Sequence, residues 1–361
     1  MKITPRLRPV LLAALAVMLG VTPRSSANPP QAPPGPQNPV PPAQQKDTQA
    51  PPPAGQAAPA GPEYTISVES ALVNLDVLVT DEDGKVLAGL KKDNFRVLDN
   101  GRPQAITNLA PVEAPITIVM LLEYSGIAYD YFAYKGADWG SGFLSHLNPE
   151  DWVALIRYDM KPAIAVDFTH NKAAVRDALN TLSYPQFREA NMFDAIFDTL
   201  DRLERVKGKK SILLITTGAD TFSRHTLDQV YRRLKEADVT VFCIGSAERE
   251  YMNAGNSLSY FQAKNQLQTF ARLTGGHSWF PRFEGELPSI FESVANFLRN
   301  QYRIGFSPPD LAHDGKYHRL KVEIVGPDGK PLVVKNDKGK RRKVIVYARE
   351  GYTDTKRPGN N

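Results

Sequence analysis

A continuous apolar run at residues 116–122 ends abruptly in the polar residues Glu123, Tyr124 and Ser125. Because both faces of this short run are apolar, it predicts a strand that is covered by helices on both sides. In open α/β sheets the carboxyl ends of the central strands form the ligand crevice. Glu123, Tyr124 and Ser125 therefore stand at a candidate binding or catalytic site.

Strand-like and helix-like patterns alternate from residue 115 to about residue 299. Short apolar runs predict further strands at residues 152–159, 162–169, 211–218, 239–246 and 277–282. Apolar residues at helical spacing predict helices at residues 131–147, 171–182, 192–206, 227–238, 262–273 and 287–300. The short link after residue 159 predicts an antiparallel pair at one edge. The fold class is therefore α/β, with a doubly wound, mostly parallel sheet.

Both flanks of this region alternate apolar and polar positions, as antiparallel strands do. Hairpin turn sequences separate the runs, DEDGK and DNGRP in residues 63–112 and PDGK in residues 301–353. Each flank alone has too few strands to be stable. We expect the two flanks to form one small antiparallel β-sandwich module, with the α/β domain of residues 113–300 inserted between them and a tail at 354–361.

The first 62 residues do not resemble a folded domain. Basic residues precede an apolar stretch at residues 9–21, and Ser25 and Ala27 follow, which is the layout of a secretory signal peptide with cleavage after Ala27. The apolar stretch is shorter than the roughly 20 residues that a membrane span requires. Residues 28–62 are rich in Pro, Ala and Gln and predict a disordered linker. We expect a secreted or periplasmic, cell-envelope protein with no membrane span after cleavage.

Charge and cysteine content exclude several classes of protein. The signal segment holds four basic residues and no acidic one, which leaves 40 basic against 39 acidic residues in the rest of the chain. This balance gives no argument for nucleic acid as a partner. The single cysteine, Cys243, cannot form an internal disulfide, and its apolar surroundings predict a buried thiol. The six histidines lack metal or triad spacing, and we expect His225 to lie solvated at a helix start.

The order of these segments resembles a von Willebrand factor A domain. The resemblance rests on the strand ITIVMLLEYSG, the strand pair at 152–169, the segment ANMFDAIFDTLDRL and the strand SILLITTGADT. The flanks are similar to those of secreted bacterial proteins related to this family, and the resemblance spans roughly residues 67–352. It implies a doubly wound sheet and a metal-ion-dependent adhesion site, at which Asp, Ser and Thr side chains hold Mg²⁺ for a partner's carboxylate.

The resemblance assigns positions in this chain to that adhesion site. The equivalent positions and their neighbours are Glu123, Tyr124, Ser125, Ile127, Ala190, Asn191, Thr217 and Asp220. Only Ser125 keeps the family's residue type. Glu123 adds a methylene to the family's Asp, and Ile127 and Ala190 supply no oxygen, whereas Mg²⁺ demands near-ideal oxygen geometry. We expect a degenerate site without metal or other cofactor; the alternative is a water-rich Mg²⁺ site that uses Glu123, Ser125, Thr217 and Asp220.

These features predict an exported, non-enzymatic protein-binding or adhesion-type module with an unidentified protein partner. A structural role in envelope assembly is an alternative that the sequence does not separate from the first. A hydrolase with Glu123 as general acid or base beside Ser125 is a third reading. It would need a second titrating group in the crevice, and the sequence places none there.

Overall fold

The computed structural model describes residues 72–112, 115–126, 128, 136–182, 184–246, 257–308, 315–335 and 338–354. The predicted signal peptide and linker, Ile127 and the tail beyond residue 354 lie outside these residues. The described residues belong to one compact unit, Ile66–Asn361. No helix in this described part of the chain combines the length and apolar character needed to cross a bilayer.

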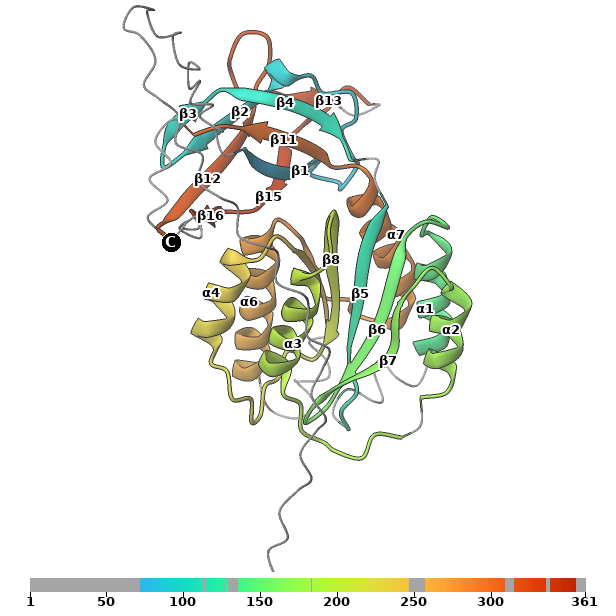
Figure 1. Ribbon diagram of the computed structural model, residues 1–361. Helices are drawn as coiled ribbons and strands as arrows, with labels where there is room; N and C mark the ends of the chain where they lie inside the picture. Colours follow the sequence, from blue (N-terminus) through green and yellow to red (C-terminus); the bar gives the residue numbers. More distant parts are fainter. Residues whose placement is uncertain are drawn as a thin grey trace, which may run out of the picture. The chain divides into compact units, whose positions relative to one another are not determined.

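A six-stranded sheet with the strand order β10-β9-β8-β5-β6-β7 forms the centre of the fold (Figure 1). Its strands are β5 (Ile116–Glu123), β6 (Trp152–Tyr158), β7 (Pro162–Thr169), β8 (Lys209–Thr216), β9 (Thr240–Gly245) and β10 (Ser278–Trp279). Every neighbouring pair is parallel except β6 and β7, which are antiparallel. The predicted doubly wound, mostly parallel sheet with a reversed edge strand is confirmed.

Helices cover both faces of this sheet, as the apolar run in β5 requires. They are α1 (Gly136–Ser145), α2 (Lys172–Asn180), α3 (Met192–Glu204), α4 (Leu227–Glu236), α6 (Ser257–Thr274) and α7 (Leu287–Arg299). Alternate residues of β5 enter two different cores: Met120 packs with α1, α2 and α7, whereas Leu121 packs with α3, α4 and α6 (Figure 1). Both side chains are at most 1% exposed, which explains why the run has no polar face.

Among the described helices, the start of α6 departs most from the sequence-based prediction, whereas the predicted start of α1 is not tested. The part of α1 that the structure describes begins at Gly136, and residues 131–135 of the predicted helix lie outside the described residues. Helix α6 begins at Ser257, five residues before the predicted start. The first turn of α6 exposes Leu258 and Phe261 to solvent. This turn therefore lacks the amphipathic pattern by which the rest of the helix was found.

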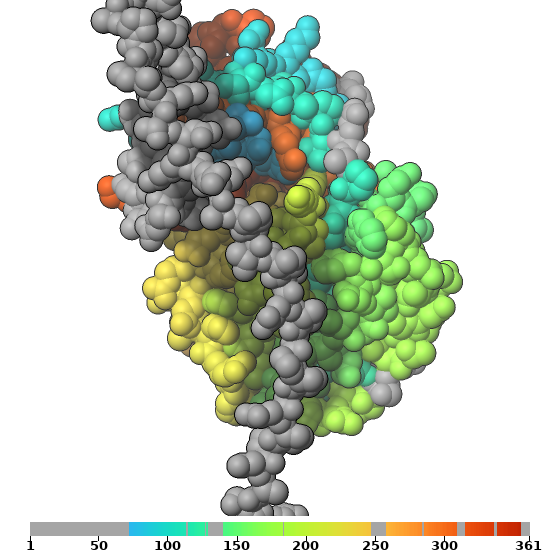
Figure 2. Space-filling view, viewed as in Figure 1, coloured from blue at the N-terminus to red at the C-terminus, as the bar shows by residue number. Residues whose placement is uncertain are grey.

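Strands from the two flanks of the chain interleave in two four-stranded sheets, ordered β15-β1-β11-β4 and β16-β12-β2-β3. Their bounds are β1 (Val73–Asp81), β2 (Phe95–Asp99), β3 (Arg102–Gln104), β4 (Ile106–Pro111), β11 (Tyr302–Phe306), β12 (Tyr317–Ile324), β15 (Val344–Ala348) and β16 (Gly351–Thr353). Figure 2 shows the blue and cyan N-terminal residues beside the orange C-terminal ones. We call these two sheets the β module. Both sheets contribute to one apolar cluster, which includes Leu75, Val97, Ile304 and Leu320.

The remaining elements of the described residues are short. They are the 3-10 helices at Lys92–Asn94 and Glu284–Glu286 and the paired strands β13 (Val334–Lys335) and β14 (Arg341–Arg342). The predicted hairpin turn between β2 and β3 uses Asn100 and Gly101 at φ values of 47° and 82°. These left-handed backbone angles suit the Asn-Gly pair of a tight hairpin.

The β module contacts the α/β domain through backbone and charged side chains. Gly275, directly after α6, has a φ of 79°, and a Cβ atom there would lie 2.7 Å from the backbone nitrogen of Arg349. The guanidinium group of Arg349 donates to the carbonyl oxygens of Lys235 (2.9 Å) and Ala237 (3.3 Å) at the end of α4. The positive charge of Arg349 at the C-terminal end of α4 also interacts favourably with the helix dipole. The module and the domain therefore share a closely packed boundary.

Candidate functional site

Glu123, the last residue of β5, is completely buried and saturated with hydrogen bonds. Its Oε1 accepts a bond of 2.7 Å from the Ser125 hydroxyl. Its Oε2 accepts three bonds, from the Thr216 hydroxyl (2.8 Å), the Thr217 N–H (2.7 Å) and the Thr217 hydroxyl (2.8 Å). Burial raises the pKa of Glu123, although the same hydrogen bonds oppose that shift. The carboxyl group thus binds three neighbouring residues of its own chain.

Tyr158 extends this network across the sheet. Its hydroxyl donates to the Thr216 hydroxyl over 2.8 Å, and the Thr216 hydroxyl in turn donates to Glu123. Burial and the carboxylate of Glu123 together raise the pKa of Tyr158. Tyr158, Glu123 and Thr216 end the adjacent strands β6, β5 and β8, so the sheet itself brings them together. Sequence reasoning missed Tyr158 and Thr216. The sequence did hold a signal for both, because each is the polar residue at the end of an apolar strand run.

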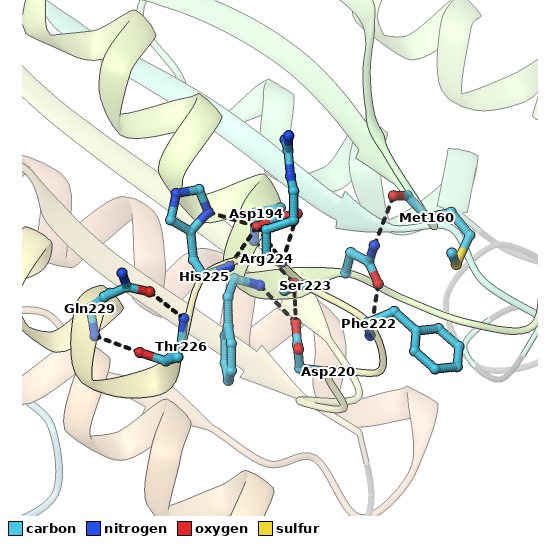
Figure 3. Close-up of polar contacts among 11 residues, drawn as sticks. Met160, Asp194, Asp220, Phe222, Ser223, Arg224, His225, Thr226 and Gln229 are labelled. Carbon is cyan, nitrogen blue, oxygen red and sulfur yellow. Dashed lines mark hydrogen bonds and ion pairs between the residues drawn. The ribbon is translucent and has the colours of Figure 1, made fainter.

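A second polar cluster ties the loop after β8 to the start of α3 (Figure 3). Asp220 Oδ1 accepts hydrogen bonds from the backbone N–H of Phe193 (2.9 Å) and from the hydroxyl of Ser223 (2.6 Å). Asn191 Oδ1 accepts the N–H of Phe222 over 3.0 Å instead of capping its own helix. The loop therefore supplies an acceptor for the first turn of α3. Asn191 and Asp220, both predicted site residues, hold this loop in place.

Asp194 in the first turn of α3 anchors the end of the same loop (Figure 3). It accepts the backbone N–H groups of Arg224 and His225, and its Oδ1 lies 2.6 Å from Nδ1 of His225. Burial raises the pKa of Asp194, but these hydrogen bonds outweigh it and hold the pKa below its usual value. The His225 ring stacks on Phe197 with a centroid separation of 3.7 Å. The prediction that His225 lies solvated was wrong. Its ring contacts Asp194 and Phe197, which both belong to α3, and the local sequence before α4 does not reveal these partners.

The remaining predicted site residues are Tyr124, Ala190 and Ile127. Tyr124 is buried, and the guanidinium carbon of Arg157 lies 5.3 Å from the centre of its ring. Ala190 is buried, and its carbonyl accepts the N–H of Thr221 over 2.8 Å. Ile127 lies outside the described residues. Glu123, Ser125 and Thr217 are thus joined directly, whereas Ala190, Asn191 and Asp220 form the contact between the loop and α3.

The side chains at this strand end do not fit a magnesium ion. Mg²⁺ requires an octahedral shell of oxygen ligands and usually keeps several waters. Here both oxygens of the Glu123 carboxyl group already accept hydrogen bonds within the core, and Ala190 has no side-chain oxygen. Among the residues that the structure describes, no three His, Cys, Asp or Glu side chains are grouped so as to hold a metal.

Large apolar side chains are exposed around the same edge of the sheet. They belong to the segments that precede α3, follow β8, open α6 and follow β10, and they are Tyr184, Phe187, Phe222, Leu258, Phe261 and Phe283. The carbonyl of Phe187 accepts the N–H of Gly126 over 2.8 Å, which places this residue next to the Glu123 network. Clusters of exposed apolar residues commonly mark interaction sites.

Comparison with protein families now assigns the α/β domain. The model of the von Willebrand factor type A domain matches residues 118–275. These residues form a von Willebrand factor A domain. The resemblance seen in the sequence is confirmed, and the A domain includes β5 to β9 with the helices between them. Domains of this family are generally non-enzymatic modules that bind other proteins.

Other comparisons give distant similarity. No curated protein matches the sequence. Proximal thread matrix protein 1 from the mussel byssus is similar at 14% identity and a TM-score of 0.41, covering 52% of this chain and 49% of that one. BatB from Bacteroides thetaiotaomicron has 14% identity, coverage of 52% and 100%, and a TM-score of 0.40. A von Willebrand factor type A protein from Catenulispora acidiphila has 13% identity, coverage of 76% and 79%, and a TM-score of 0.40. The chain spans about half the length of the first of these structures.

Proposed function

We propose that this protein is an exported binding module whose A domain holds a partner protein at the carboxyl edge of its sheet without a metal ion. The observation that carries the proposal is the set of exposed apolar side chains at that edge. Phe222 and Phe187 are 64% and 46% exposed, although both lie in loops that hydrogen bonds fix to the core. Exposed aromatic residues on a fixed scaffold are the usual anchors of protein interfaces.

The Glu123 network supports binding without metal. In this proposal the carboxylate stabilises the strand ends from within, because three of its four hydrogen bonds join the end of β5 to the end of β8. The loop after β8 is then held to α3 by Asp220 and Asp194. The result is a fixed platform that needs no ion to shape it. Such preorganisation lowers the entropy lost on binding.

Exposed arginines beside the aromatic residues indicate the chemistry of the partner. The side chain of Arg224 is 88% exposed, and Arg188, next to Phe187, is exposed as well. Arginine and aromatic residues are enriched together at protein interfaces. The partner that fits is a protein surface with an apolar side chain flanked by carboxylates. This chemistry suits adhesion to another protein better than assembly through the β module, whose apolar residues fill its own core.

The hydrolase reading finds no support at the same site. Ser125 and Glu123 are both completely buried, and the Ser125 hydroxyl donates to Glu123. A nucleophile or general acid must come within hydrogen-bonding distance of its substrate. Neither group is placed to do so.

Removing the exposed aromatic residues tests the proposed surface. We expect the double change Phe187→Ser with Phe222→Ser to weaken capture of the partner roughly tenfold or more, because it deletes two anchor side chains. The measurement is quantitative cross-linking of the exported protein to envelope proteins. The matched control is Leu72→Ser with Val333→Ser, which removes exposed apolar side chains of the β module. Equal capture by both double variants would contradict the proposal.

A further inference from the structure

A second polar site lies at the opposite, amino edge of the central sheet. A cavity of about 70 Å³ opens there between the start of β8 and the β module. The charged residues that line it are Asp76, Lys209, Lys210, Asp238, Arg303 and Arg349. None of these residues belongs to the Glu123 network or to the exposed apolar side chains at the carboxyl edge.

Lys209 is the most deeply buried of these charged residues, with 3% of its surface exposed. Its Nζ donates a hydrogen bond of 2.5 Å to the carbonyl of Leu298 in α7. An ammonium group has three donors, and within the described residues this carbonyl is its single hydrogen-bond partner. Two donors therefore remain for an acceptor in the cavity. Burial also lowers the pKa of Lys209 to about 8, so a nearby anion would favour its charged form.

The charges around the cavity do not cancel. Arg303 and Asp76 neutralise each other through two hydrogen bonds, of 2.8 and 3.0 Å. Arg349 binds backbone carbonyls, which carry no full charge. The four cationic side chains that line the cavity outnumber the two carboxylates, Asp76 and Asp238, although Asp76 also acts on Lys209 and Arg349. Buried charge without a counterion is costly, and the excess here is positive.

We propose that this cavity binds a small free oxyanion of the size of phosphate or sulfate. A water molecule needs about 10 to 15 Å³ of such a cavity, so a space of about 70 Å³ admits several waters or one tetrahedral oxyanion. The anion would accept hydrogen bonds from Lys209 and balance the excess positive charge. Because Lys209 and Lys210 belong to β8 and Arg349 follows β15 of the β module, the anion would also strengthen the contact between the module and the A domain.

Phosphate binding to the full-length exported protein tests the proposal. We expect sodium phosphate to raise the melting temperature in a saturable manner beyond sodium chloride of equal ionic strength, and isothermal titration calorimetry to give a matching dissociation constant. Lys209→Met should weaken binding about tenfold or more, since it removes charge-assisted hydrogen bonds. The exposed neighbour Lys207→Met should bind like the unaltered protein. No saturable effect, or equal binding by Lys209→Met, would overturn the proposal.

Three further binding measurements test the proposal if Lys209→Met folds poorly. Lys210→Glu changes a partly exposed group at the cavity and should also weaken phosphate binding. Sulfate, whose charge is constant near neutral pH, should bind more weakly as pH rises through about 8, where Lys209 loses its proton. Glycerol 3-phosphate should bind more weakly than free phosphate; tighter binding of the ester would overturn the assignment to a free anion.

Discussion

Replacing Glu123 by alanine is expected to lower the free energy of unfolding by about 3 kcal/mol, because buried donors lose their acceptor and a cavity is left. The affected donors are the hydroxyls of Ser125 and Thr216 and both donors of Thr217. All three residues lie in the core of the A domain. Urea unfolding followed by circular dichroism measures the loss.

Glu123→Gln is the matched control for that experiment. Its amide oxygen can take the place of Oε2, and its amide NH₂ can donate to the Ser125 hydroxyl, so we expect a change within about 1 kcal/mol. The pH dependence gives a second readout. Burial raises the pKa of Glu123 above its unfolded value, so the pH-dependent part of its stabilisation is present at low pH and is lost as pH rises through the folded pKa. Glu123→Gln should remove that decline. An alanine variant as stable as the glutamine variant would show that the network contributes nothing.

Deleting residues 302–361 is expected to prevent folding of the β module and cause aggregation. The deletion removes β11 from between β1 and β4, and it removes β12, which pairs with β2. Apolar side chains such as Leu75 and Val97 would then be exposed along unpaired strand edges, which template aggregation. The soluble yield in a size-exclusion assay should fall roughly tenfold or more, because the strands that remain cannot form a stable sheet.

A shorter deletion separates this effect from truncation in general. Removing residues 355–361 leaves every described strand in place, so yield and melting temperature should match those of the full chain. A soluble deletion of residues 302–361 that still melts cooperatively would mean that the two flanks fold independently.

Much of the A domain could be predicted from local sequence pattern. The run in β5 is apolar at every position because its alternate residues enter different cores, and this pattern does not depend on distant partners. The antiparallel pair β6 and β7 followed from a link too short for a crossover. The start of α6 was missed because its first turn exposes Leu258 and Phe261, so hydrophobic periodicity gave no signal there.

The candidate site was harder to predict, because its contacts join residues far apart in the chain. Glu123 and Ser125 were found from the end of an apolar run and Thr217 from the family resemblance. The hydrogen bonds between Glu123 and Thr217 depend on the register between β5 and β8. Tyr158 is 58 positions from its partner Thr216. His225 was misjudged because Asp194, its partner, lies 31 positions away. Sequence pattern places such residues at strand and helix ends without revealing which of them meet.

Thermal unfolding with magnesium or manganese chloride, against sodium chloride of equal ionic strength, tests whether this A domain shapes its strand end without a metal ion. A working metal site at a hundredfold excess over its dissociation constant would add about 2.7 kcal/mol of stability, and the melting temperature would rise by roughly 5 °C or more. We expect no rise with either ion and no fall on adding a chelator. A saturable rise with magnesium that Glu123→Gln abolishes would instead show that the strand end holds a metal ion.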